Sequence, residues 1–142
     1  GLPRAGWLRR IYGRYFSMQA FRIVVIGAGE TGTPLLQQLL NAPFVELVGV
    51  ADLNLELPGI ALARQHQIPV TNNFMELVSQ GTAVDIIIDV TGAAKVREQL
   101  RQYMVDSRNT HTVIMHERIA LLMMSLSAGS LVDGKHGVQE YA

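Results

Sequence analysis

Apolar positions follow two alternating patterns along this chain. Short runs such as 22–26, 45–51 and 84–90 are apolar at nearly every position, which predicts β-strands buried in a parallel sheet. Between the runs, apolar residues recur at the spacing of one helix face. Strands are expected near residues 22–26, 45–51, 68–70, 84–90 and 112–115, and helices near residues 31–41, 58–67, 74–80, 95–106 and 118–126. This alternation predicts a doubly wound α/β domain with a parallel sheet of about five strands in the order 3-2-1-4-5.

The expected boundaries divide the chain into three segments. Residues 1–21 form a basic arm, residues 22–126 the α/β domain, and residues 127–142 a tail or linker. We interpret the arm as an amphipathic helix that packs on the domain or on a second copy, and contact with a membrane surface is the alternative. Its apolar side consists of Trp7, Leu8, Ile11, Tyr12, Tyr15 and Phe16, opposite Arg9, Arg10 and Arg14.

The first predicted strand runs directly into a glycine-rich turn. Gly27, Gly29 and Gly32 have the spacing G-x-G-x-x-G between a strand and a helix, the arrangement that binds dinucleotides. Gly27 allows the tight turn, Gly29 lets a pyrophosphate approach the backbone, and Gly32 lets the helix pack closely on the strand. The N–H groups at the helix start would then bind the phosphates. A glycine-rich turn in a fold that binds no nucleotide is the alternative.

The second predicted strand ends in an acidic residue. Asp52 lies 20 residues after Gly32, where a carboxylate accepts hydrogen bonds from the adenosine ribose. Leu53 and Asn54 follow, and no nearby arginine is placed for a 2′-phosphate. The sequence therefore predicts that the cofactor is NAD rather than NADP.

Composition narrows the remaining possibilities. The chain has 142 residues, of which 49% are hydrophobic and 17% charged, as in a single globular domain. Its formal net charge is +0, which gives no electrostatic reason to expect a nucleic-acid partner. It has no cysteine, so disulfides, thiol catalysis and cysteine-based metal sites are excluded, in keeping with a cytoplasmic location. No pair of histidines has metal-ligand spacing, and we predict no metal site.

The predicted domain resembles the cofactor domain of the glucose-fructose oxidoreductase and inositol dehydrogenase family, to which homoserine dehydrogenase and dihydrodipicolinate reductase have related domains. The resemblance rests on Val25–Gly29, Val48–Asp52, Gly59–Ala63 with Ile68–Val70, and Asp85–Gly92, and it implies a Rossmann fold over about residues 22–126. It also implies three sets of dinucleotide contacts. These are Gly27, Gly29, Glu30 and Thr31 at the pyrophosphate, Asp52 at the ribose, and Thr91, Gly92 and Ala93 on the nicotinamide side.

The chain departs from these enzymes after its fifth predicted strand. They have Glu-Lys-Pro there, with a lysine that works near the substrate, whereas this chain has Glu117-Arg118-Ile119. A guanidinium stays charged at any relevant pH and cannot serve as a proton donor and acceptor. Only sixteen residues follow Leu126, which is too few for a substrate domain. We therefore expect no catalytic residue and no turnover from this chain alone.

Three functions remain open at this point. The first is an NAD(H)-binding module of a larger protein with a sensory or regulatory role, similar to Rossmann modules at the start of some bacterial signalling proteins. The second is the cofactor domain of an oxidoreductase whose substrate domain lies outside this chain. The third is a structural domain used for self-association.

Two further features bear on the site and on assembly. His116 follows the fifth strand at the expected crevice, where it is predicted to contact the nicotinamide, and a partly exposed loop histidine is the alternative. Asp89 is expected to satisfy backbone groups nearby. The run 119–124 is apolar nearly all round. Together with the apolar side of the arm, it predicts a homodimer.

Overall fold

The computed structural model describes residues 20–134, and every structural statement below concerns these residues. One sheet of five parallel strands runs through the molecule in the order β3-β2-β1-β4-β5, as predicted. The strands are β1 (Phe21–Ile26), β2 (Val45–Ala51), β3 (Val70–Thr71), β4 (Ile86–Asp89) and β5 (Val113–His116). The helices are α3 (Gly32–Asn41), α4 (Pro58–Gln65), α5 (Met75–Val78), α6 (Ala94–Ser107) and α7 (Glu117–Ala128), with a 3₁₀ turn η1 (Gly81–Ala83).

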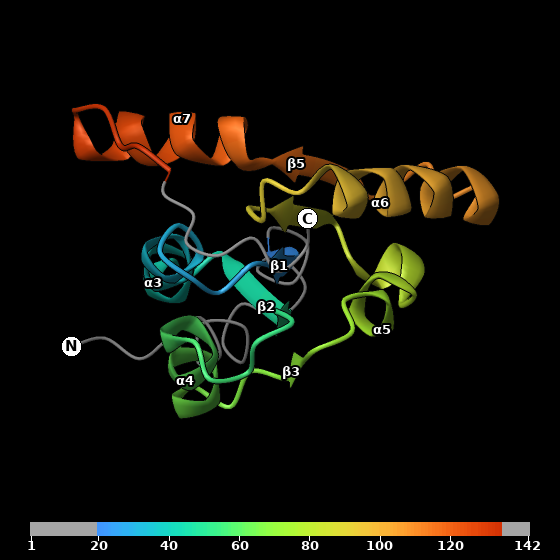
Figure 1. Ribbon diagram of the computed structural model, residues 1–142, viewed down its shortest axis with the longest axis horizontal. Coiled ribbons are helices and arrows are strands. Elements are labelled where there is room, and N and C mark those ends of the chain that lie inside the picture. The colour runs from blue at the N-terminus through green and yellow to red at the C-terminus, as the bar shows by residue number, and fades with distance from the viewer. Residues whose placement is uncertain (1–19, 135–142) are drawn as a thin grey trace.

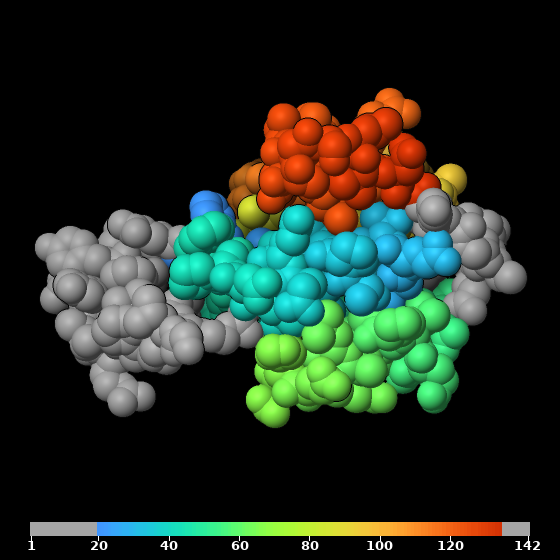
Figure 2. All heavy atoms as spheres, turned by 90° about the vertical axis from the view of Figure 1, so that its left-hand side faces the viewer, coloured from blue at the N-terminus to red at the C-terminus, as the bar shows by residue number. Residues whose placement is uncertain are grey.

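Helices cover both faces of the sheet, because successive residues of a buried strand point to opposite sides. In β1, Ile23 and Val25 pack with α3, α4 and α7 in one core cluster. Val24 and Ile26 pack with α5 and α6 in the other. Figure 1 shows the two layers on either side of the strands, and Figure 2 shows α7, α3 and α4 stacked along one side of the molecule. The double winding expected from the sequence is confirmed.

Four elements are shorter than the sequence predicts, namely β3, α4, α5 and β4. The third strand is only Val70–Thr71, since the preceding Pro69 has no N–H to donate to a ladder. The helix expected over 74–80 is the single turn Met75–Val78. Gly81 has φ +68, a left-handed conformation that interrupts the helical path before η1. The side chain of Asn73, one residue before the N-cap Phe74, accepts a hydrogen bond from the N–H of Met75 at 3.2 Å.

Helix α7 buries only one stripe of its apolar run. Ala120 and Met124 are buried, whereas Ile119, Leu122 and Met123 lie 46–52% exposed on the outer side. The helix continues to Ala128, two residues into the expected tail. Residues 1–19 of the arm lie outside the described residues, so the homodimer stays a prediction. Within residues 20–134 no helix is long and apolar enough to cross a membrane.

A charged cluster fixes the amino ends of three strands. Asp85, just before β4, accepts hydrogen bonds from the backbone N–H of Arg22 at 2.9 Å and from its guanidinium at 2.9 and 3.1 Å. His111, just before β5, contacts the same carboxylate through Nε2 at 2.7 Å. The pKa of the Asp85 carboxyl is held well below its usual range, mainly by the hydrogen bonds from the Arg22 side chain. The cluster therefore links β1, β4 and β5 far from the glycine-rich turn.

We expect Asp85→Asn to lower the thermal unfolding midpoint at pH 7 by roughly 2–8 °C. The folded protein holds this carboxylate ionised, so its contribution is full above the ordinary pKa of an aspartate, about 4. The contribution is lost as the pH falls further, through the lowered pKa of the folded state. Melting curves of wild type and variant from pH 7 to pH 3 test this expectation. The difference in midpoint should shrink only below about pH 4, and a constant difference over the whole range would contradict it.

Candidate dinucleotide-binding site

The predicted site residues gather at the carboxyl edge of the sheet. The glycine-rich turn follows β1, Asp52 follows β2, Thr91 follows β4 and His116 ends β5. In open parallel sheets, ligands bind outside the carboxyl ends of the strands where the strand order reverses. In this sheet that point lies between β1 and β4, which pair directly although β2 and β3 separate them in sequence.

The glycine-rich turn is held in place by its backbone. Gly27 has φ +112, and a Cβ there would lie 2.9 Å from the Cγ2 of Val90, so only glycine fits. The next residue, Ala28, is held through both its N–H and its carbonyl. The N–H of Ala28 donates to Oδ2 of Asp52 at 2.8 Å, and its carbonyl accepts from Thr33 Oγ1 and from the Gly59 N–H, each at 3.0 Å. The residue that follows β2 and residues at the start of α3 and α4 therefore all bond to the backbone of Ala28.

The start of α3 leaves room for a ligand. A Cβ built on Gly29 would meet no atom within 4 Å. By contrast, a Cβ on Gly32 would overlap the carbonyl oxygen of Gly27, which confirms the predicted close packing of helix on strand. The Thr31 hydroxyl is buried and has no hydrogen-bond partner among residues 20–134, and Glu30 beside it is exposed. A bound phosphate would supply the acceptor that this hydroxyl lacks, so the residues fit a pyrophosphate.

Asp52 has a structural role that the sequence pattern did not reveal. Its side chain is buried, and both carboxylate oxygens accept backbone hydrogen bonds, one from Ala28 and one from Asn54 at 3.0 Å. A carboxylate oxygen can accept more than one hydrogen bond. The same group is thus able to hold the turn and still receive ribose hydroxyls.

The turn after β4 is organised by a second buried carboxylate. Oδ1 of Asp89 accepts from the N–H of Thr91 at 3.0 Å and from its hydroxyl at 2.6 Å. That hydroxyl in turn accepts from the N–H of Ala93 at 3.2 Å, and Gly92 has φ +67. The residues expected on the nicotinamide side therefore form one hydrogen-bonded turn. Asp89 does satisfy backbone groups, as the sequence suggested.

His116 is bonded to that same carboxylate. Its Nδ1 lies 2.8 Å from Oδ2 of Asp89, and the two residues are direct partners in the parallel ladder of β4 and β5. Since the carboxylate is 3% exposed and accepts this bond, Nδ1 is the donor and Nε2 is left free. His116 is therefore more than a partly exposed loop residue. No sequence pattern indicated this pair, because its members lie 27 positions apart.

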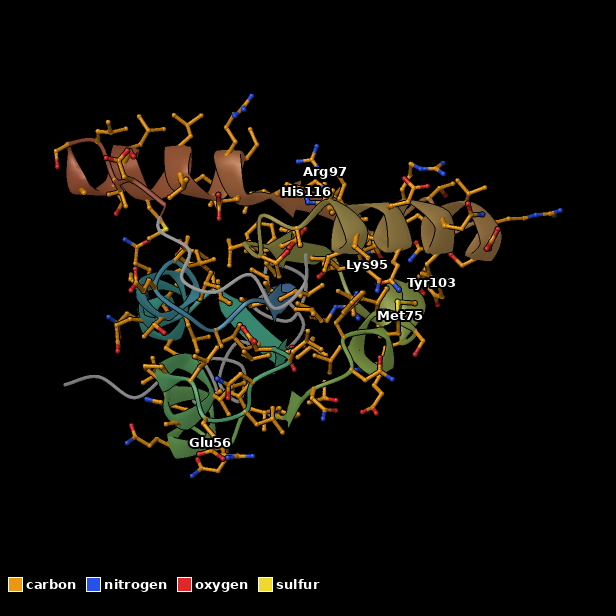
Figure 3. All side chains as sticks on the ribbon, in the orientation of Figure 1. Glu56, Met75, Lys95, Arg97, Tyr103 and His116 are labelled. Atoms are coloured by element: carbon orange, nitrogen blue, oxygen red, sulfur yellow. The ribbon has the colours of Figure 1, made fainter. Side chains whose placement is uncertain are left out.

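A groove of about 1050 Å³ runs from this pair along β5 between α6 and α7. Gly92, Ala93 and His116 line it beside Arg97 of α6, and Figure 3 shows Arg97 and His116 at the end of β5. Arg118 also lines the groove. Residues 20–134 contain no group of three or more potential metal ligands.

Comparison with known proteins agrees with this geometry. Residues 27–121 match the model of the homoserine dehydrogenase NAD-binding domain. An acetaldehyde dehydrogenase from Bacillus cereus is 27% identical over 96 residues, which cover 63% of this chain and 32% of that protein. One from Chloroflexus aggregans is 33% identical over 73 residues, covering 51% of this chain and 24% of the relative. The chain thus spans about a third or less of the length of these relatives.

Two solved structures share the fold. GenD2 from gentamicin A biosynthesis, solved in complex with NAD, superposes with a TM-score of 0.53 at 21% identity and covers 69% of this chain and 34% of its own. A myo-inositol dehydrogenase from Corynebacterium glutamicum has a TM-score of 0.53 at 19% identity, and the match covers 78% of this chain and 33% of that protein. The family model spans most of the sheet and both predicted turns. This chain therefore belongs to the family of the homoserine dehydrogenase NAD-binding domain.

Proposed function

We propose that this chain binds NAD(H) as a module of a larger protein, with a sensory or regulatory role rather than catalysis by itself. One observation carries the proposal: there is open space above Gly29 at the start of α3, within a turn where Ala28 is held through both its N–H and its carbonyl. Such a turn presents N–H groups to a pyrophosphate without needing to be ordered first. The pyrophosphate would contact Gly27, Gly29, Thr31 and Gly32 beside the exposed Glu30, and Thr91, Gly92, Ala93 and His116 would face the nicotinamide.

The non-catalytic part of the proposal rests on the end of β5. The exposed Arg118 stands where enzymes that this chain resembles have a lysine. A guanidinium there binds anions but does not exchange protons.

We expect NAD to bind at least tenfold more tightly than NADP, because the Asp52 carboxylate would pair with ribose hydroxyls and repel a 2′-phosphate. A charge-assisted hydrogen bond contributes roughly 1.5–3 kcal/mol, which is tenfold or more in affinity. Calorimetric titration of the full chain with both dinucleotides gives the ratio. Asp52→Asn should bring the affinities for NAD and NADP closer together. It should also weaken both of them, since Asp52 holds Ala28 as well.

Asp106→Asn is the matched control. It removes the same charge from an exposed position in the last turn of α6. Its ratio of affinities should equal that of the wild type. Tighter binding of NADP than of NAD by the wild type would contradict the assignment of Asp52.

A second candidate function is the cofactor domain of an NAD-dependent oxidoreductase whose substrate domain lies elsewhere. The Asp89–His116 pair favours it, because a histidine oriented by a buried carboxylate is a common proton-transfer arrangement.

We expect the chain alone to show no turnover. Incubation with NAD and a panel of sugars, polyols and amino acids should produce no rise in NADH absorbance. A rise with any one of them, absent in His116→Gln, would favour the oxidoreductase.

A further inference from the structure

The carboxylate of Asp89 connects two parts of the edge that lie far apart in the sequence. Through Oδ1 it holds the Thr91 turn, and through Oδ2 it holds His116. A single side chain, that of Asp89, therefore joins the imidazole to the turn that the proposed function places beside the nicotinamide. The His116 side chain is 24% exposed, and it lines the groove.

His116 is the one histidine among the described residues that line this groove. Carboxylates and guanidinium groups ordinarily keep one charge between pH 6 and pH 8, whereas an imidazole gains or loses a proton in this range. The other charged residues that line the groove are Asp89 from β4, Arg97 from α6, Glu117 and Arg118 from α7, and Asp133 from the segment after α7.

We propose that the Asp89–His116 pair makes the choice between NAD⁺ and NADH depend on pH. The inference rests on the proposed function, and it adds which oxidation state the site selects. The nicotinamide ring of NAD⁺ carries a positive charge, and that of NADH is neutral. Protonation of His116 changes the net charge of the pair from −1 to zero, which weakens its attraction for the former ring and not for the latter. Protonation at Nε2 therefore favours NADH, and by linkage bound NADH favours protonation.

The test compares three ligands by calorimetric titration of the full chain at pH 6 and pH 8. NAD⁺ and NADH differ at the nicotinamide, and ADP-ribose lacks that ring and reports any pH effect at the adenine and phosphate end. We expect the preference for NADH over NAD⁺ to rise about five- to tenfold at the lower pH, the lower part of the usual range for coupled sites. The affinity for ADP-ribose should change much less.

Two variants distinguish a pH effect of the Asp89–His116 pair from an effect of another histidine. His116→Gln keeps a polar side chain without a titrating group, and the ratio of the NADH and NAD⁺ affinities should no longer change with pH. His111→Gln is the matched control, because His111 also pairs with an aspartate on the same two strands but at their opposite ends. Its pH dependence should equal that of the wild type.

The outcomes distinguish this inference from the function on which it rests. If all three ligands bind and the ratio for the wild type stays within twofold between pH 6 and pH 8, the inference is wrong and the proposed function stands. If the ratio changes equally in His116→Gln, another group is responsible and the inference is again wrong. If none of the three binds at millimolar concentration, the proposed function fails and the inference fails with it.

Discussion

Replacing Gly29 with valine is expected to abolish dinucleotide binding while the protein stays folded. No atom lies within 4 Å of a Cβ at this position, so the Cβ of the new side chain meets no protein group. The branched side chain would instead fill the space that the pyrophosphate needs. We expect affinity for NAD to fall by about 100-fold or more, which corresponds to roughly 2.8 kcal/mol.

Titration with NAD and a thermal melt of the same sample test both halves of this expectation. Gly29→Ala gives a graded comparison, because one methyl group occupies less of the same space and should cost less affinity. A Gly29→Val protein that binds NAD as the wild type does would remove the main support for the site. A Gly29→Val protein that does not fold would show that the glycine is needed for structure instead.

Gly32→Ala is expected to have the opposite signature, a large loss of stability. The added methyl group would overlap the carbonyl oxygen of Gly27 and lie 2.6 Å from its carbonyl carbon. These are backbone atoms of the fastened turn, so α3 must move away from the sheet. Helix propensity alone favours alanine over glycine by about 1 kcal/mol, but overpacking of a rigid contact typically costs about 1–3 kcal/mol or more. We therefore expect net destabilisation.

Urea unfolding followed by circular dichroism measures the change, and Gly29→Ala serves as the control. It is the same substitution three positions earlier in open space, so its free energy of unfolding should stay close to that of the wild type. Equal stabilities of Gly32→Ala and the wild type would mean that α3 does not pack on Gly27 as described.

The features that could be predicted from the sequence are those set by residues close together along the chain. The strand Ile86–Asp89 is buried on both sides, as the nearly continuous run of apolar residues over 84–90 predicted. The glycine spacing located the turn because each glycine answers a local steric need, as the contacts of Gly27 and Gly32 confirm. The strand order followed from the alternation of strands and helices.

What the sequence did not reveal are contacts between distant segments. Asp52 was expected at a ribose, and its bond to Ala28 depends on where the end of β2 lies relative to β1. The bond between Asp89 and His116 depends on the register of two strands, which no local pattern specifies. Side-chain partners across a sheet become visible only once the strands are aligned.

The two histidine–aspartate contacts also bear on the position of the last strand. Among residues 20–134, β5 lies at the edge of the sheet and pairs only with β4, through four residues. Short edge strands are prone to slide along their neighbours. A slide by one residue would break the His111–Asp85 contact and the His116–Asp89 contact together, and it would exchange the faces on which Ile114 and Met115 lie. One histidine–aspartate contact at each end of β5 therefore holds the register of this strand against β4.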